Sequence, residues 1–101
     1  SLYNAKTDSW RQVDLKRPRS TPSSVLLPDG TVLIINGEWS AIDQDNATAV
    51  LPPELDPRVP QIFDPQTGSI VNDIMEPDGV QSFRGYHNWA VLLKDARVMT
   101  G

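Results

Sequence analysis

Cysteine is absent from this chain of 101 residues, and histidine occurs once, at His87. The lack of cysteine excludes disulfides, thiolate metal ligands and a cysteine nucleophile. No run approaches the ~20 apolar residues of a membrane-spanning helix, and no segment has the 3.6-residue apolar period of a packed helix. The formal net charge is −4, and the basic residues are scattered apart from Arg11 and a run at residues 16–19. We expect this run to form a solvated loop. This charge pattern does not favour binding to nucleic acid.

Nine prolines and six glycines interrupt the chain, and 39% of its residues are apolar. This composition is typical of one small strand-rich unit rather than of a disordered tail. A chain of this length buries only about 60–65% of its unfolded surface, so short strands alone form a marginal core. We therefore expect the chain to be part of something larger, and the isolated chain to be unstable or associated.

Two apolar runs that flank an Asp-containing turn have nearly the same sequence. Residues 23–35 are echoed by residues 88–99, in which residues 23–33 match residues 89–99 at an offset of 66 that relates Leu26 to Leu92. Alternating apolar positions and β-branched residues indicate strands on both sides of each turn. The predicted strands lie near residues 23–27, 31–35, 89–93 and 97–99.

A second repeat relates residues 2–10 to residues 62–70 with an offset of 60. Each copy predicts a strand, an Asx-led turn and a strand, because Asn4 and Asp64 can bond their own backbone two residues on. The chain is therefore predicted to be all-β, with eight short strands in four antiparallel hairpins and almost no helix. A repeat of about 60 residues with four strands is the size of a propeller blade with a loop insertion.

The positions at which the repeats start along the chain divide it into three parts. We expect residues 1–22 to form the outer hairpin of one blade and a connecting loop, residues 23–83 to form one complete blade, and residues 84–101 to form the inner hairpin of the next. The complete blade contains an insertion at residues 38–60, whose prolines keep it out of a central ladder. Such an insertion projects from a rim, where function commonly lies.

Two segments carry a family resemblance. Residues 25–37, and the tetrapeptide Arg84-Gly85-Tyr86-His87 with the hairpin that follows it, resemble the galactose oxidase and glyoxal oxidase group of copper-radical oxidases. The resemblance spans most of the chain and implies a kelch-type β-propeller, of which this chain forms about two of seven blades. It also implies that Tyr86 and His87 are copper ligands, and that Tyr86 takes the proton of the substrate hydroxyl.

The same resemblance implies an enzyme that oxidises a small aldehyde, primary alcohol or sugar with O2 and releases H2O2. It places the protein outside the cell or on its surface, with the remainder of the propeller supplied by the same gene product or by a second chain. The family's cofactor needs a cysteine joined covalently to a tyrosine, and the copper site needs a second histidine. Both are missing here, so the Cys–Tyr radical cofactor is expected from outside this chain, and the isolated chain is not expected to be active.

Two positions depart from the family pattern. Asn88 stands where the family has serine, and Ala96 stands in a turn where the family has glycine, as the first copy of the repeat does at Gly30. Because alanine adopts positive φ less readily than glycine, we expect the second turn to be of a different type.

Tyr86 and His87 also have a purely structural interpretation. Neighbouring side chains on a strand point to opposite faces, so the two can share one ion only before the strand begins, at a bend that Gly85 permits. Otherwise Tyr86 closes the end of an inner strand and His87 is a hydrogen-bonded loop residue. The alternative function is then a non-catalytic kelch propeller that binds a protein or a glycan, since fold does not set function. Packing positions are expected for Trp10, Trp39 and Trp89.

Overall fold

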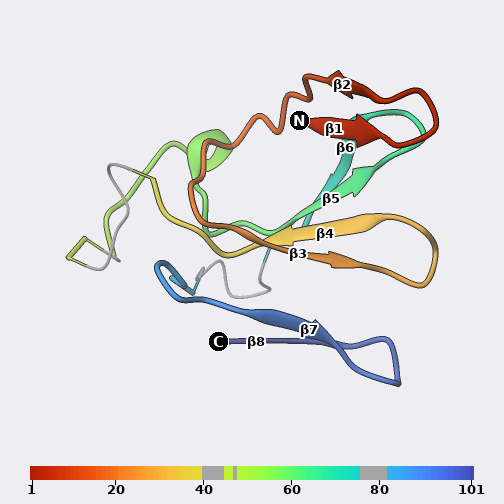
Figure 1. Cartoon of the computed structure of the whole chain (residues 1–101). Helices are drawn as coiled ribbons and strands as arrows, with labels where there is room; N and C mark the ends of the chain where they lie inside the picture. The colour runs from red at the N-terminus through yellow and green to blue at the C-terminus, as the bar shows by residue number, and fades with distance from the viewer. Residues whose placement is uncertain (40–44, 47, 76–81) are drawn as a thin grey trace.

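The computed structural model describes residues 1–39, 45–46, 48–75 and 82–101, which form an all-β structure (Figure 1). All strand pairs are antiparallel, and the one helical segment in these ranges is a short 3₁₀ turn at Pro53–Leu55. The prediction of eight short strands with almost no helix is confirmed. The strands are β1 (Leu2–Asn4), β2 (Ser9–Arg11), β3 (Ser23–Leu26), β4 (Val32–Ile35), β5 (Gln61–Asp64), β6 (Ser69–Asp73), β7 (Ala90–Leu92) and β8 (Val98–Thr100).

The strands form three sheets. β3, β4, β5 and β6 make a four-stranded sheet in chain order, here named the central sheet, whereas β1–β2 and β7–β8 are separate two-stranded hairpins. Figure 1 shows the central sheet between the two hairpins, with β7 beside β3. The four predicted hairpins are therefore all present, and the second and third are joined through β4 and β5.

The two outlying hairpins contact opposite faces of the central sheet. Leu2 of β1 lines a cavity together with Ser24 and Ile34 of the sheet, whereas the Ser23 hydroxyl donates to the side chain of Asn88, just before β7. Because Ser23 and Ser24 are neighbours on β3, their side chains point to opposite faces. The β1–β2 hairpin thus lies on one face and the β7–β8 hairpin on the other.

The 66-residue sequence repeat is also a repeat of strand register. Leu26 lies opposite Val32 in the β3–β4 hairpin, and Leu92 lies opposite Val98 in the β7–β8 hairpin. Since a slip of one residue would move every side chain to the other face, the equal registers give the two hairpins equivalent faces.

The turns of these two hairpins have the same conformation, so the prediction of a different second turn is wrong. Gly30 has a φ of 85° and Ala96 a φ of 66°, and the N–H of each donates to the carbonyl three residues earlier, at 3.0 Å and 3.1 Å. An L-residue in this left-handed region costs about 1–2 kcal/mol. The strand ladder offsets that cost, together with the Asp95 carboxylate, which accepts a bond from the Arg97 N–H at 3.3 Å.

In the 60-residue repeat, the two copies have the same strand register next to the turn, and the registers differ beyond a β-bulge. Tyr3 lies opposite Trp10 in β1–β2, as Phe63 lies opposite Ile70 in β5–β6. A register shift follows between Ile62 and Phe63, and such a bulge bends and twists a strand locally. Trp10 packs on Tyr3 with ring centroids 5.0 Å apart, although 72% of Trp10 stays exposed.

The hydrophobic core is small, as expected for a chain of this length. It lies mainly within the central sheet, where β4 buries side chains on both of its faces and β3 and β5 each bury one apolar side chain. One further buried residue belongs to the insertion, just before β5. The buried apolar side chains of the described residues are Val25, Leu33, Ile34, Val59 and Phe63.

Candidate functional site

Tyr86 and His87 lie in a turn that precedes β7, so neither belongs to a strand, as a shared metal site requires. The bend is at His87, whose φ is 61°, and not at Gly85 as predicted. Gly85 has a different role. A Cβ at this position would lie 2.5 Å from the Phe83 ring and 2.8 Å from the Glu38 carboxylate. Gly85 therefore allows the Phe83 ring and the Glu38 carboxylate to lie against the backbone, and a Cβ there would force these two side chains to shift.

The left-handed backbone at His87 belongs to the repeat. Its equivalent 66 residues earlier is Thr21, whose φ is 48°, and positive φ is uncommon for residues other than glycine. The turn thus recurs in both copies, but Ser20 and Thr21 carry small hydroxyl groups where Tyr86 and His87 carry rings. In the first copy the Ser20 N–H donates to the Glu38 carbonyl at 2.7 Å. The two copies thus share a positive φ at equivalent positions, but they differ in local hydrogen bonding and in side-chain chemistry.

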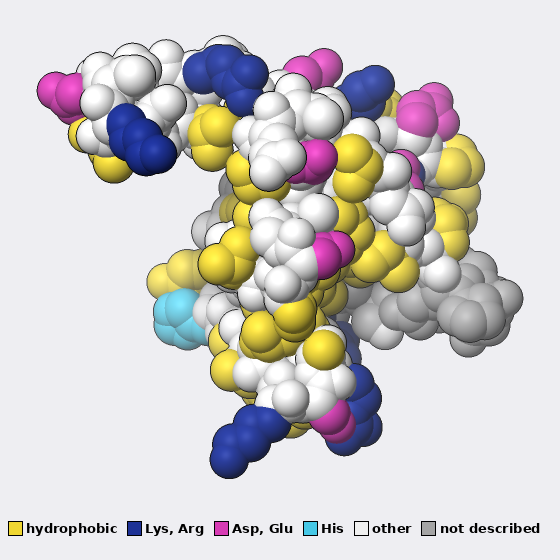
Figure 2. Space-filling view, turned by 90° about the vertical axis from the view of Figure 1, so that its right-hand side faces the viewer, with side chains coloured by type: hydrophobic (Ala, Val, Ile, Leu, Met, Phe, Trp, Pro, Cys, Tyr) yellow, Lys and Arg dark blue, Asp and Glu magenta, His cyan; other side chains and the backbone are white. Residues whose placement is uncertain are grey.

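The rings of Tyr86 and His87 stack on each other, with centroids 3.9 Å apart and planes at 26°. Tyr86 is 70% exposed and His87 is exposed as well, and the histidine side chain stands out at the surface in Figure 2. Within the described ranges, neither the phenol oxygen nor the imidazole nitrogens make a hydrogen bond. Both groups are therefore open to a partner from outside these residues.

Asn88 attaches this turn to the first copy of the repeat. Its Nδ2 donates to the Thr21 carbonyl at 2.7 Å and also to the Gly85 carbonyl. Its Oδ1 accepts from the Ser23 hydroxyl and, at 3.2 Å, from Nδ2 of Asn36. From the sequence, Asn88 stands out only as a departure from the family's serine, and its hydrogen bonds to the first copy of the repeat are not predicted. The sequence offered one signal for this role. An asparagine side chain has two N–H donors and a separate carbonyl acceptor, whereas a serine hydroxyl has a single donor on its only oxygen.

Asn36 makes a second attachment at the end of β4. It is buried and has a φ of 65°, a conformation that asparagine tolerates better than most residues. Its Nδ2 donates to the Thr100 hydroxyl at 2.7 Å and to the Trp89 carbonyl at 3.3 Å. Amide groups from the central sheet and from the turn thus hold the β7–β8 hairpin, and with it the Tyr86–His87 turn, in place.

Metal chemistry at this turn depends on two donors. Among the described residues, no group of three or more His, Cys, Asp and Glu side chains is arranged to hold a metal ion. Tyr86 and His87 offer an oxygen and a nitrogen, and Cu(II) favours such donors. The pair fits copper by ligand type and by exposure, and a complete centre requires ligands from outside the described residues.

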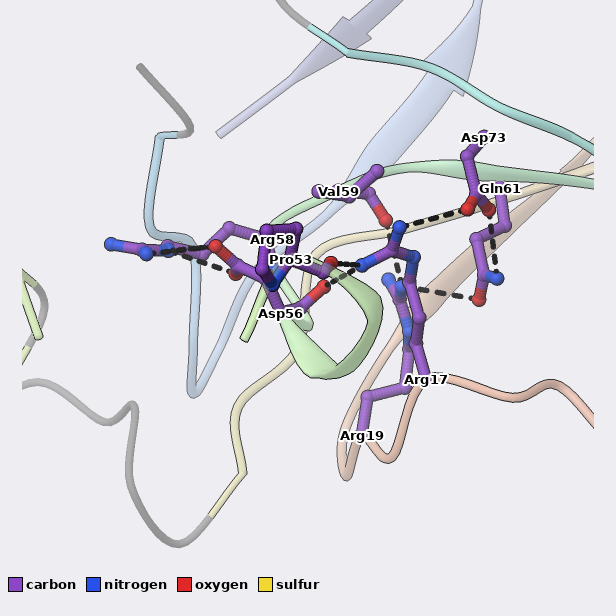
Figure 3. Close-up of polar contacts among 8 residues, drawn as sticks. All are labelled: Arg17, Arg19, Pro53, Asp56, Arg58, Val59, Gln61 and Asp73. Atoms are coloured by element: carbon purple, nitrogen blue, oxygen red, sulfur yellow. Dashed lines mark hydrogen bonds and ion pairs between the residues drawn. The ribbon is translucent and has the colours of Figure 1, made fainter. Parts of the chain in front are cut away.

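The solvated loop predicted at residues 16–19 is packed at Arg17 and Arg19, so the prediction is wrong for these two residues, whereas Lys16 is exposed. Arg17 is 6% exposed and forms an ion pair with Asp73 at 2.8 Å (Figure 3). Its guanidinium also donates to the carbonyl of Pro53 and, at 3.1 Å, to that of Asp56. Arg17 therefore ties the segment before β3 both to the insertion and to β6.

Arg19 lies beside Arg17 in the same cluster (Figure 3). It donates to the carbonyls of Asn36 and Val59, at 3.1 Å and 2.8 Å, and to the side chain of Gln61 at 3.3 Å. Burial, followed by the nearby charge of Arg17, lowers the pKa of Arg19 to about 10. The Nε atoms of both arginines are buried without a hydrogen-bond partner among the described residues. The cluster therefore carries an electrostatic cost, and its acidic and carbonyl partners offset that cost.

The carboxylates of this cluster are each tied to a cation. The Arg17 hydrogen bond holds the pKa of Asp73 below its ordinary value against the opposing effect of burial, and the Gln61 amide contributes at 3.0 Å. Burial alone would raise the pKa of Asp56, but its hydrogen bonds and 2.8 Å ion pair with Arg58 lower it overall. These ion pairs attach the insertion to the central sheet, and neither carboxylate is free to act as an acid or a base.

Basic side chains on the face shown in Figure 2 are dispersed among acidic and apolar ones. No helix in the part of the chain that the structure describes is both long and apolar enough to cross a membrane. Comparison of the chain with protein-family models, with curated proteins and with solved structures found no match.

Proposed function

We propose that this chain is part of a copper-radical oxidase that resembles galactose oxidase and glyoxal oxidase, and that Tyr86 and His87 are two of its copper ligands. One observation carries the proposal. The two rings occupy one exposed turn, without hydrogen bonds to the described residues, at the place where the first copy of the repeat has Ser20 and Thr21. At these two positions the second copy of the repeat carries side chains that could bind a metal, whereas the first copy carries small hydroxyl groups.

The fold part of the proposal is a fragment of a kelch-type propeller. In this arrangement β1–β2 is the outer half of one blade, the central sheet is a complete blade, and β7–β8 is the inner half of the next. The equal registers of the repeated hairpins support it, as does the position of the central sheet between the two others. The remaining blades would come from the same gene product or from a second chain.

In the proposed site His87 acts as a nitrogen ligand and Tyr86 as an oxygen ligand whose phenolate also accepts the proton of the substrate hydroxyl. Copper, with a Cys–Tyr radical cofactor from outside this chain, supplies the one-electron chemistry that oxidises a small aldehyde, primary alcohol or sugar with O2 to give H2O2. Gly85 and Asn88 hold the turn, so the two donors are positioned by the β7–β8 attachment rather than by their own contacts.

Titration with Cu(II) tests the assignment. His87→Asn is the appropriate replacement, because asparagine accepts the positive φ of this position while losing the imidazole. It should remove the nitrogen coupling from the copper EPR spectrum and weaken binding, and Tyr86→Phe should remove the phenolate-to-copper absorption band. Tyr3→Phe, at another exposed tyrosine, is the matched control and should change neither signal.

In the protein that contains the remaining ligands, the double variant Tyr86→Phe with His87→Asn should lose bound copper and H2O2 production. If copper content and H2O2 production stay at wild-type values, the pair is structural and the proposal fails. The alternative is a non-catalytic propeller that binds a protein or a glycan. The exposed Tyr3 and Trp10, whose rings contact each other at a 43° tilt, favour a glycan, because aromatic faces can pack against sugar rings.

A further inference from the structure

The segment that follows β4, residues 36–38, contacts both copies of the turn that the 66-residue repeat relates. On the side of the first copy, the N–H groups of Ser20 and Glu38 each donate to the other residue's carbonyl, at 2.7 Å and 3.1 Å. On the side of the second copy, the Gly37 N–H donates to the Arg84 carbonyl at 2.8 Å. Backbone hydrogen bonds through this segment therefore connect the first turn to the start of the second.

Side chains extend this contact to both sides of the Tyr86–His87 pair. Before the pair, the Glu38 carboxylate lies so close to Gly85 that a Cβ there would be 2.8 Å from it. After the pair, Nδ2 of Asn36 donates to Oδ1 of Asn88 at 3.2 Å. Because neither ring makes a hydrogen bond to the residues that the structure describes, the position of the pair depends on these flanking contacts.

Position 37 requires glycine for two reasons. Gly37 has a φ of 101°, which residues with a side chain rarely adopt. A Cβ at this position would also lie 2.6 Å from the Ser20 carbonyl oxygen. That oxygen belongs to a backbone pair, so it cannot turn away as the end of a flexible side chain could. A larger residue at position 37 would therefore push the end of β4 away from the turns on either side of it.

We propose that residues 36–38 position the two donors of the Tyr86–His87 site, and that Gly37 is the principal positioning residue. In the proposed propeller this segment belongs to the complete blade, whereas the donors begin the next one, so each ligand position is set by the neighbouring blade. Partners of this kind orient metal ligands without binding the metal. The inference rests on the proposed function for its copper readout, and its first test needs no copper.

NMR of the copper-free chain tests the positioning. His87 is the single histidine, so its ring protons give an isolated signal, and the stack on the Tyr86 ring at 3.9 Å shifts that signal from its random-coil position. Gly37→Ala should move the signal toward the random-coil position. Gly30→Ala is the matched control and should leave it in place, because Gly30 also has a positive φ, of 85°, but a Cβ there meets nothing within 4 Å.

Asn36→Asp provides a second test that does not depend on whether Gly37→Ala folds. Aspartate keeps the shape of the side chain and tolerates the φ of 65° at this position. It places an oxygen against Oδ1 of Asn88 and the Trp89 carbonyl, where Asn36 has a donor. The His87 signal should move as in Gly37→Ala, while the methyl signals of the central-sheet core stay at their folded positions.

Copper binding gives an independent readout. Both variants should weaken Cu(II) binding about 10-fold, the lower end of the range for residues that orient metal ligands. They should also shift the copper EPR parameters while the nitrogen coupling from His87 remains, whereas His87→Asn removes that coupling. A wild-type chain that binds no Cu(II) would refute the proposed function and leave the NMR test to decide the positioning. The positioning is overturned if Asn36→Asp leaves the His87 signal unchanged, or if Gly30→Ala moves it as far as Gly37→Ala.

Discussion

Asn88→Ala should loosen the attachment of the β7–β8 hairpin to the central sheet. The substitution removes four side-chain hydrogen bonds, two donated to the carbonyls of Thr21 and Gly85 and two accepted from Ser23 and Asn36. At a net value of ~1 kcal/mol each, their loss would cost ~4 kcal/mol. Several partners recover, however, because Thr21 is exposed to water and the Asn36 amide keeps its bonds to Thr100 and Trp89. We therefore expect the free energy of unfolding to fall by about 2 kcal/mol.

Urea denaturation followed by tryptophan fluorescence measures this loss. With m values of ~1–3 kcal/mol/M for a small protein, a loss of ~2 kcal/mol lowers the midpoint by roughly 0.7–2 M. Asn72→Ala is the matched control, since Asn72 is an exposed strand residue whose side chain makes no hydrogen bond among the described residues. Asn88→Ser should fall between the two variants. If Asn88→Ala shifts the midpoint no more than Asn72→Ala, the amide contacts do not hold the hairpin and the argument for Asn88 is refuted.

Two further substitutions probe the turn and the arginine cluster. Ala96→Gly should raise the free energy of unfolding by ~0.5–1 kcal/mol, because release of left-handed strain exceeds the added entropy of the unfolded chain. Gly30→Ala, where a Cβ meets nothing within 4 Å, should have the opposite effect, and a lower melting temperature for Ala96→Gly would contradict this account. Asp73 has a depressed pKa in the folded state, so its stabilising effect is present above the ordinary carboxyl pKa of ~3.9 and is lost as pH falls below it. Asp73→Asn should therefore be less stable at neutral pH and should lose less stability on acidification, and unchanged acid sensitivity in urea titrations would argue against the ion pair with Arg17.

Strand positions and hairpin pairing could be predicted because they depend on local patterns that occur twice. Leu26 and Leu92 are equivalent in sequence and also in register. The error at Ala96 has a related cause. The expectation of a different turn rested on alanine's preference for negative φ, whereas the strand pairing on both sides of the turn imposes a positive φ. The position of Tyr86 and His87 before β7 followed from the same repeat, and their role stays a prediction.

Burial of Arg17 could not be predicted, because its partners lie in the insertion and in β6, where no repeat or period relates them to residue 17. A basic run next to proline has the pattern of a solvated loop, and only three-dimensional packing shows otherwise. The role of Asn88 was hidden for a similar reason. Its partners Thr21 and Ser23 are more than 60 residues away in the sequence, and an amide is compatible with many environments.

Arg17 also affects the order in which the chain folds. Its hydrogen bonds join residues 36, 39 and 56 positions apart in the sequence, whereas short turns close the four hairpins. Hairpins form within about 1–10 μs, but the guanidinium finds its partners only after the insertion and β6 have come together. The arginine cluster is therefore a late contact, and the rate-limiting step of folding should be the docking of preformed hairpins. A contact that forms last in folding is expected to break first in unfolding. Transient opening of the native chain should therefore begin where the insertion contacts Arg17 and Arg19.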